Sequence, residues 1–205
     1  MKPKQTEQNT EQKIKEAAKK VFLERGFDGA KLRHIAEESG TTMAMVNYYF
    51  RGKEQLFQSI FMETMGSFLG RITFILNEEV PLEIKVWKVV DNYTDFLLDN
   101  PHMPVFVLSE LQKNSSEIFE KLNIKSVVES SFFTKQLQVE SEKGTIRKVK
   151  PLQLIVTLLG SLIFPFMAKP IVAYIGSLDS TAYRAFLEER KVIVFETVMA
   201  YLKPT

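Results

Sequence analysis

Cysteine is absent from the 205-residue sequence, and histidine occurs only at His34 and His102. Without a thiol, the chain has no disulfide framework, thiolate metal site or thiol nucleophile, and it suits a reducing compartment. Neither histidine has a partner at metal-ligand spacing, so we expect no metal site. The sequence also lacks a Ser-His-Asp order, a Gly-rich phosphate loop and a catalytic carboxylate pair. We therefore expect neither an enzyme nor a bound cofactor.

Patterns typical of β-strands are also nearly absent, because the only alternating apolar stretch is Thr145-Ile146. The composition, 45% hydrophobic and 25% charged residues, is that of a globular protein, and the length allows one large or two modest domains. The N-terminal stretch MKPKQTEQNTEQ lacks the apolar region of a signal peptide, so we expect a cytoplasmic protein. The predicted fold class is all-α.

Two short helical patterns separated by a glycine lie near the N-terminus. In the first, Leu32 and Ile35 recur at helical spacing and form part of one apolar face. Gly40 ends this helix, because glycine adopts the left-handed conformation without steric cost. Thr41 or Thr42 is expected to cap the second helix, its hydroxyl accepting a hydrogen bond from an unpaired amide.

The second helix of this pair buries Val46 and Phe50 on one side. Its other side carries Ala44, Asn47 and Tyr48. Helices joined by so short a turn cross steeply, as in a helix-turn-helix. The charge distribution is compatible with DNA binding. Residues 1–57 hold 11 Lys and Arg against 8 Asp and Glu, and the remainder holds 16 against 17.

Helical periodicity and turn residues predict the other elements. The expected helices run from Thr10 to Gly26, from Leu32 to Gly40, from Met43 to Phe50, from Lys53 to about Glu78, from Pro81 to about Asp99, from Val105 to about Gln112, from Ser115 or Ser116 to about Glu142, from Pro151 to about Met167 and from Thr181 to Leu202. Residues 1–9 are expected to form a flexible arm. Residues 10–57 then form an N-terminal three-helix domain, and a long helix joins it to a larger helical domain at residues 58–205.

The segment GFDGAKLRHIAEESGTTMAMVNYYFRGKEQLF resembles the DNA-binding segment of TetR-family transcriptional regulators. The resemblance is carried by Gly26-Phe27, Ile35-Ala36, Gly40, Tyr48-Tyr49-Phe50 and Lys53-Glu54-Gln55-Leu56. The chain departs from the family pattern at Ala30-Lys31, where Thr-Ser is usual, and at Met43, which is often polar. The later stretch GTIRKVKPLQLIVTLLGSLIFPFMAKP resembles the C-terminal domain of many members.

The resemblance implies which side chains meet DNA. The residues expected to face base edges are Met43, Ala44, Met45, Asn47 and Tyr48, and those expected to hold phosphates are Thr42, Tyr49 and Lys53. This set suits base reading, because asparagine pairs with adenine and apolar groups pack on thymine methyls. Lys31 and Arg33 are expected backbone contacts, although Arg33 is equally well explained as a solvated surface charge.

The second domain is rich in aromatic residues, most of which we assign to its core. A subset is expected to line a cavity for a small apolar or amphipathic effector. The candidates are Trp87, Phe106, Phe132 and Phe164. The sequence does not separate cavity-lining aromatics from core aromatics.

Two stretches are apolar nearly all round, residues 152–167 and 192–202. A helix that packs on its own domain needs only one apolar stripe, so we expect a second apolar face to be buried against another chain. We predict a homodimer through these helices, with Ile155, Leu158, Leu162, Phe166, Ile193 and Met199 at the interface. Residues 151–168 also reach the ~18-residue length of a membrane helix, but their polar and Gly-Pro content favours burial in an oligomer over membrane contact.

Together these features predict a homodimeric, sequence-specific DNA-binding regulator that binds a palindromic operator and releases it on binding a small molecule. The alternative is an all-α ligand-binding or scaffolding protein with a vestigial helix-turn-helix. An enzyme is a distant third interpretation.

Overall fold

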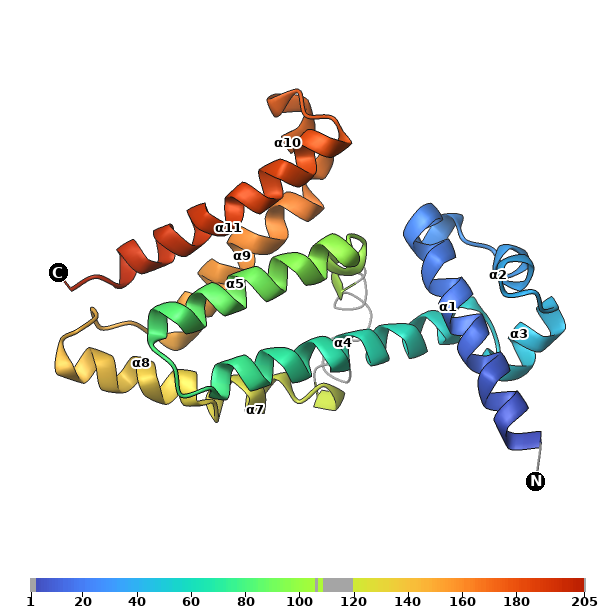
Figure 1. Cartoon of the computed structure of the whole chain (residues 1–205), viewed down its shortest axis with the longest axis horizontal. Coiled ribbons are helices and arrows are strands. Elements are labelled where there is room, and N and C mark those ends of the chain that lie inside the picture. The colour runs from blue at the N-terminus through green and yellow to red at the C-terminus, as the bar shows by residue number, and fades with distance from the viewer. Residues whose placement is uncertain (1–2, 106, 109–119, 205) are drawn as a thin grey trace. The chain divides into compact units, whose positions relative to one another are not determined.

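The computed structural model describes residues 3–105, 107–108 and 120–204, and within these ranges all regular secondary structure is helical (Figure 1). The all-α prediction is therefore confirmed. The chain divides into two compact units, Met1–Ser67 and Phe68–Thr205. The division falls inside the long helix α4 (Lys53–Asn77), C-terminal to the boundary that we predict at Phe57.

The first unit contains α1 (Pro3–Gly29), α2 (Leu32–Ser39), α3 (Met43–Phe50) and the start of α4. Helix α1 begins at Pro3, so the prediction of an arm over residues 1–9 is wrong from residue 3 onward. The reason is local: Gln, Glu and Lys are good helix formers, and proline is tolerated in the first turn. Gly26 interrupts α1 with a positive φ of 67°, at the position where the sequence predicts the helix to end.

The core of the first unit forms where α1, α2, α3 and the beginning of α4 meet. Its buried members are Ile14, Ala18, Val21, Phe22, Ala30, Ile35, Ala36, Val46, Phe50, Leu56 and Ile60. Helical spacing brings the α1 residues of this set onto one face, which packs against α2. This packing fixes the position of α3.

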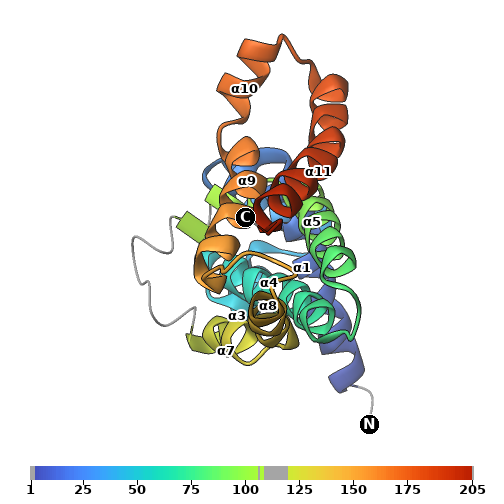
Figure 2. The same ribbon diagram turned by 90° about the vertical axis from the view of Figure 1, so that its left-hand side faces the viewer.

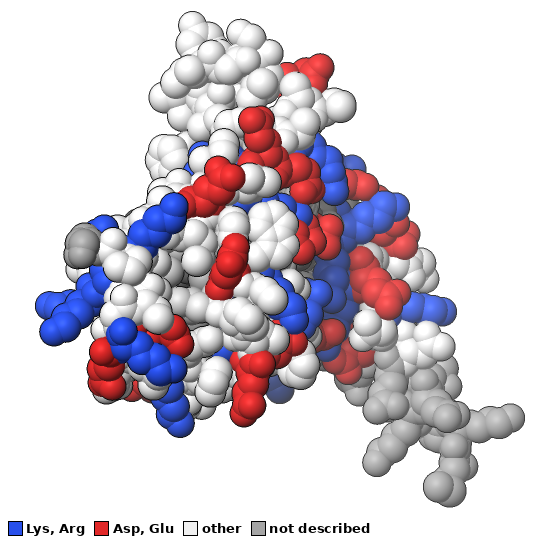
Figure 3. Space-filling model, turned by 60° about the vertical axis from the view of Figure 1, so that its left-hand side comes forward, with Lys and Arg blue, Asp and Glu red and all other residues white. Residues whose placement is uncertain are grey.

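The second unit contains the rest of α4, followed by α5 (Leu82–Asp99), α7 (Ile124–Glu129), α8 (Phe132–Lys143), α9 (Pro151–Met167), α10 (Lys169–Gly176) and α11 (Ser180–Leu202). Helix α5 packs against α8, α9 and α11. Figure 2 shows α9 and α11 linked through α10. The surface over α10 carries few charged side chains (Figure 3), and Ile171, Tyr174 and Ile175 are exposed there.

Two helix predictions in the second unit need correction. For the helix expected from Ser115 or Ser116 to about Glu142, the start lies outside the described residues. Helix α7 begins only at Ile124, after Asn123 in a left-handed conformation with φ 50°, and the chain breaks again between Glu129 and Phe132. The break arises because the Ser131 hydroxyl caps α8 by accepting the amide hydrogen of Thr134, at 3.3 Å. Helix α10 was not predicted. The helix expected from Val105 to about Gln112 lies largely outside the described residues.

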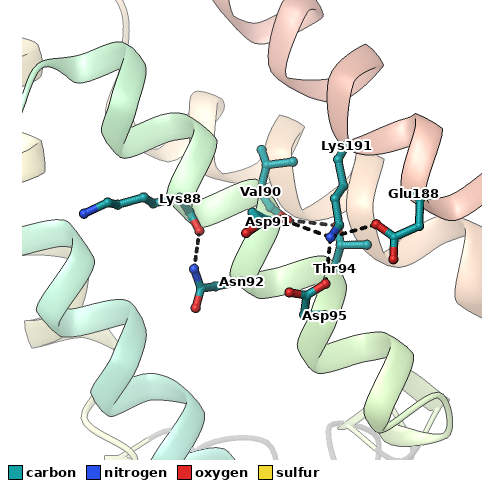
Figure 4. A network of polar contacts seen from close by, with 8 residues as sticks. All are labelled: Lys88, Val90, Asp91, Asn92, Thr94, Asp95, Glu188 and Lys191. Carbon is teal, nitrogen blue, oxygen red and sulfur yellow. Dashed lines mark hydrogen bonds and ion pairs between the residues drawn. The ribbon is translucent and has the colours of Figure 1, made fainter.

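A buried cation ties α11 to α5 (Figure 4). The ammonium of Lys191 lies 2.7 Å from Asp95 Oδ1 and 2.9 Å from both Asp91 Oδ1 and Glu188 Oε2. Burial by itself lowers the pKa of Lys191, but the hydrogen bonds that its ammonium donates to Asp95, Glu188 and Asp91 outweigh this effect and raise that pKa. The lysine therefore stays charged although it is buried.

Among the described residues, no single helix is both long and apolar enough to cross a membrane. Helices α9 and α10 meet the length and composition criteria only when taken together, across a bend of 76°.

Candidate nucleic-acid interface

The turn between α2 and α3 has the geometry predicted from Gly40. This glycine adopts a left-handed conformation, with φ 64° and ψ 28°. The next amide, that of Thr41, donates to the carbonyl of Ala36 at 2.9 Å. The hydroxyls of Ser39 and Thr41 lie 2.7 Å apart and share a hydrogen bond. The turn is therefore held by its own polar groups, which fixes where α3 starts.

Thr42 is the residue that caps α3. Its hydroxyl accepts a hydrogen bond of 3.2 Å from the amide of Met45, which would otherwise be unpaired. Val46 and Phe50 are buried against the core of the first unit. Since α3 is anchored along this one stripe, its opposite side is free to meet a partner.

The exposed side of α3 contains every residue predicted to read bases. Met43, Ala44, Met45, Asn47 and Tyr48 are all exposed, with Tyr48 at 77%. Helix α3 carries no charged residue. Its surface therefore offers one amide, one phenol and apolar groups, which fits contact with base edges better than neutralisation of phosphates.

Two of the predicted phosphate contacts are engaged within the protein. Tyr49 is half-buried and packs against the core, with its ring 5.3 Å from that of Tyr48 and 6.3 Å from that of Phe50. Lys53 donates to the carbonyl of Phe27 at 3.0 Å, and its ammonium lies 4.2 Å from the centroid of the Phe27 ring. Lys53 thus joins the start of α4 to the end of α1, just after the interruption at Gly26. Its contact with phosphate stays a prediction.

The start of α2 has a cap that the sequence did not reveal. Lys31 occupies the N-cap position, and its amide donates to Nδ1 of His34 at 3.3 Å. Desolvation, followed by the charges of Arg25 and Arg33, lowers the pKa of His34, which favours the neutral imidazole that this bond requires. His34 therefore pairs the amide of the N-cap residue at a start of α2 that lacks the usual Thr-Ser pair. The predicted backbone contacts Lys31 and Arg33 are both exposed.

The turn between α3 and α4 contains a further basic residue that the sequence analysis missed. Arg51 caps the C-terminus of α3 in a left-handed conformation, with φ 56° and ψ 19°. Its amide donates to the carbonyl of Asn47 at 2.8 Å, and Gly52 follows with φ 134°. The dipeptide Arg-Gly directly after a helix is a turn signal that could have drawn attention to this position.

Three of the four aromatic residues predicted to line an effector cavity belong to the described part of the chain, and each has different surroundings. Trp87 is partly exposed, and its ring lies 5.5 Å from that of Phe195. Phe132 lies beneath the ammonium of Lys85, 4.5 Å from its ring centroid. Phe164 is exposed on α9. Phe106 lies outside the residues whose placement is described.

The predicted dimer-interface residues divide between the core and the surface. Leu158 and Leu162 are buried inside their own chain, at 5% exposure each, so their prediction as partner contacts is wrong. The cause is helical spacing: they continue the stripe of Leu154 that packs on α5 and α11. Ile193 is exposed, whereas Ile155, Phe166 and Met199 are half-buried.

Comparisons with known proteins agree with this architecture. The family model for bacterial regulatory proteins of the tetR family matches residues 14–60, which cover α2, α3 and the adjoining parts of α1 and α4. The "Fatty acid metabolism regulator protein" of Bacillus subtilis is 26% identical over 110 residues, 54% of this chain. That alignment spans 57% of the relative's length.

Two further comparisons extend over most of the chain. The "Probable HTH-type transcriptional regulator YttP" of Bacillus subtilis is 24% identical over 195 residues, covering 90% of this chain and 91% of the relative. The solved structure of FadR from Bacillus subtilis, in complex with stearoyl-CoA, superposes with a TM-score of 0.64 at 18% identity. This superposition covers 93% of this chain and 98% of that one. It establishes a common fold across both units.

Proposed function

Because the chain belongs to the TetR family of bacterial regulatory proteins, we propose that it is a sequence-specific DNA-binding transcriptional regulator that acts as a homodimer. The observation that carries this proposal is the uncharged, exposed face of α3. A capped helix that is anchored by Val46 and Phe50, and that presents Asn47 and Tyr48 outward, suits insertion into a major groove.

The second part of the proposal is the dimer. The exposed side of α9 carries Leu152 at 69%, Val156 at 57% and Phe164 at 61%. Gly160 lies between them, and a Cβ built there would meet no atom within 4 Å. On α11, Ile193 is also exposed. These apolar side chains supply the surface for a second copy, and an obligate interface of this kind buries roughly 2,000 Å² or more.

The third part is release of the operator by a small molecule bound in the second unit. In a dimer, the two copies of α3 would enter successive major grooves about 34–36 Å apart. A ligand that binds another dimer geometry more tightly shifts the population away from that spacing. FadR, which has the same fold, binds stearoyl-CoA. A long-chain acyl-CoA is therefore the first effector class to test.

Selection of bound sites from random DNA, followed by a salt titration, tests the proposed function. We expect a palindromic site and an affinity that falls steeply with salt, because each neutralised phosphate releases counterions. Stearoyl-CoA is expected to raise the melting temperature and to release the selected site. A chain that selects no sequence would instead support a ligand-binding or scaffolding protein. A ligand that stabilises the protein but leaves DNA affinity unchanged would exclude induction from this site.

A further inference from the structure

The structure assigns to Arg51, in the turn between α3 and α4, a contact with the DNA phosphate backbone. This inference rests on the proposed function. Helix α3 has no charged residue, so the cations that hold it on DNA must come from the segments before and after it. On the N-terminal side, Lys31 and Arg33 of the neighbouring α2 are exposed. On the C-terminal side, the cations closest in sequence are Arg51 and Lys53.

Of these two cations, only Arg51 has a side chain without a polar or ring contact in the described part of the chain. The Lys53 ammonium is bound to the Phe27 carbonyl and lies over its ring. The side chain of Arg51 is exposed and has no hydrogen bond, ion pair or ring contact to any described residue. An unpaired guanidinium presents its donors in a fork that matches a phosphate group.

The backbone holds Arg51 next to the base-reading surface. Its amide is bonded to the carbonyl of Asn47, so Arg51 follows Met43 and Asn47 at intervals of four residues along α3. Residues at this spacing lie on one side of a helix. Because Arg51 comes after the last helical residue, its side chain leaves from the end of the reading face. Phosphates flank the groove at such a position, whereas base edges lie under the middle of the helix.

The backbone conformation of Arg51 supports a role in binding, because glycine would be more stable than arginine at this position. A left-handed φ of 56° is strained for arginine and free of strain for glycine. A glycine there would also serve as the ordinary C-cap. Strain held at an exposed position beside a candidate site is the pattern expected when a side chain is kept for binding.

The experiment compares wild-type protein, Arg51→Gly and Arg51→Lys on the selected operator and on random duplex DNA across a salt series. Two matched controls lie in the second unit. Ser177→Gly relieves the same left-handed strain, since Ser177 has φ 50°, and Arg184→Gln removes an exposed charge from α11. Thermal melting is recorded for every variant.

We expect Arg51→Gly to melt no lower than wild type and to weaken binding to both DNAs by the same factor. The slope of log affinity against log salt should become shallower by about 0.9 for each copy of Arg51. The ratio of wild-type to variant affinity should therefore fall about eightfold per copy when the salt concentration is raised tenfold. Arg51→Lys should keep most of the slope, and both controls should bind as wild type does.

Three results would overturn the inference. Unchanged binding by Arg51→Gly would show that the guanidinium meets no phosphate. A loss confined to the selected operator would make Arg51 a base-reading residue instead. If Arg51→Gly melted at a lower temperature than wild type, the Arg51→Lys variant would be the test. A salt dependence of its DNA affinity as shallow as that of Arg51→Gly would contradict an ionic contact with phosphate. Wild-type protein without salt-dependent DNA binding would reject the proposed function itself.

Discussion

The guanidinium of Arg190 donates a hydrogen bond of 3.0 Å to the carbonyl oxygen of Ser161. Pro165 lies four residues after Ser161 inside α9 and has no amide hydrogen, so it cannot make the intrahelical bond to that oxygen. Arg190, from α11, supplies the missing donor. The Tyr183 hydroxyl, also from α11, donates to the carbonyl of Pro165 at 2.6 Å. Two side chains of α11 thus stabilise the proline turn of α9.

Replacing Arg190 by methionine removes this donor and keeps an apolar stem. We expect the free energy of unfolding to fall by about 1–3 kcal/mol, because the Ser161 carbonyl loses a charged hydrogen-bond partner. In a Pro165→Ala background the amide returns, so the same substitution should cost less. Urea denaturation of the double-mutant cycle measures the coupling, which we expect to exceed about 0.5 kcal/mol. Additive costs would show that Arg190 does not replace the missing amide.

Replacing Lys191 by methionine leaves three neighbouring carboxylates without their cation. Because Asp91, Asp95 and Glu188 are each more than a third exposed, we expect a loss of only about 1–2 kcal/mol in unfolding free energy near pH 7. Because the network raises the pKa of Lys191, its stabilisation is lost as the pH rises, so the loss in the variant should shrink above pH ~10.4, the ordinary lysine pKa. Lys88→Met is the control, since Lys88 forms an ion pair with a single described residue, Glu78. An equal loss in both variants at both pH values would contradict the network.

The phenol of the half-buried Tyr93 should lose its proton only at high pH. Burial raises the pKa of its phenol to about 12, above the ordinary value of about 10. The folded state therefore holds this proton more tightly. The stability that Tyr93 contributes is complete below pH ~10 and is lost as pH rises towards pH ~12. A rapid-mixing absorbance titration should show a transition at about pH 12 that disappears in Tyr93→Phe. It should persist in Tyr174→Phe, which removes an exposed tyrosine.

Asn47 is expected to read bases, in contrast to Arg51. Asn47→Ala should cost about 1–3 kcal/mol at one or two base pairs of the selected operator and relax the preference there. Binding to random DNA should hardly change. Asn92→Ala serves as the control, because this asparagine lies on α5 and donates to the carbonyl of Lys88. Equal weakening on selected and random DNA would exclude base reading by Asn47.

A charge placed on the exposed face of α9 should separate the dimer. Val156→Glu introduces a carboxylate at a side chain that is 57% exposed in the single chain, so its cost arises at the interface. Sedimentation at low micromolar concentration should give a dimer for wild type and a monomer for the variant. Val139→Glu, on α8, changes an exposed valine outside α9 and α11 and should stay dimeric. A monomeric wild type would reject the dimer proposal.

The sequence by itself determined the helix-turn-helix, because its signals are local. Gly40 and Thr42 act on the residues next to them, and the spacing of Val46 and Phe50 fixes which side of α3 is buried. Exposure of Asn47 and Tyr48 follows from the same spacing. The proline that opens α9 marks its start for the same local reason.

Tertiary structure decided what depends on partners far away in the chain. Lys53 has the charge of a phosphate ligand, but packing also brings Phe27 beneath its ammonium and the Phe27 carbonyl within hydrogen-bond distance of it. Helix α9 is apolar on more than one side, so periodicity alone did not reveal that Leu158 faces the core and Val156 faces outward. The contact of Lys191 with Asp91 joins residues a hundred positions apart. These contacts depend on which surfaces pack together in the folded chain, and the local spacing of residues does not specify that packing.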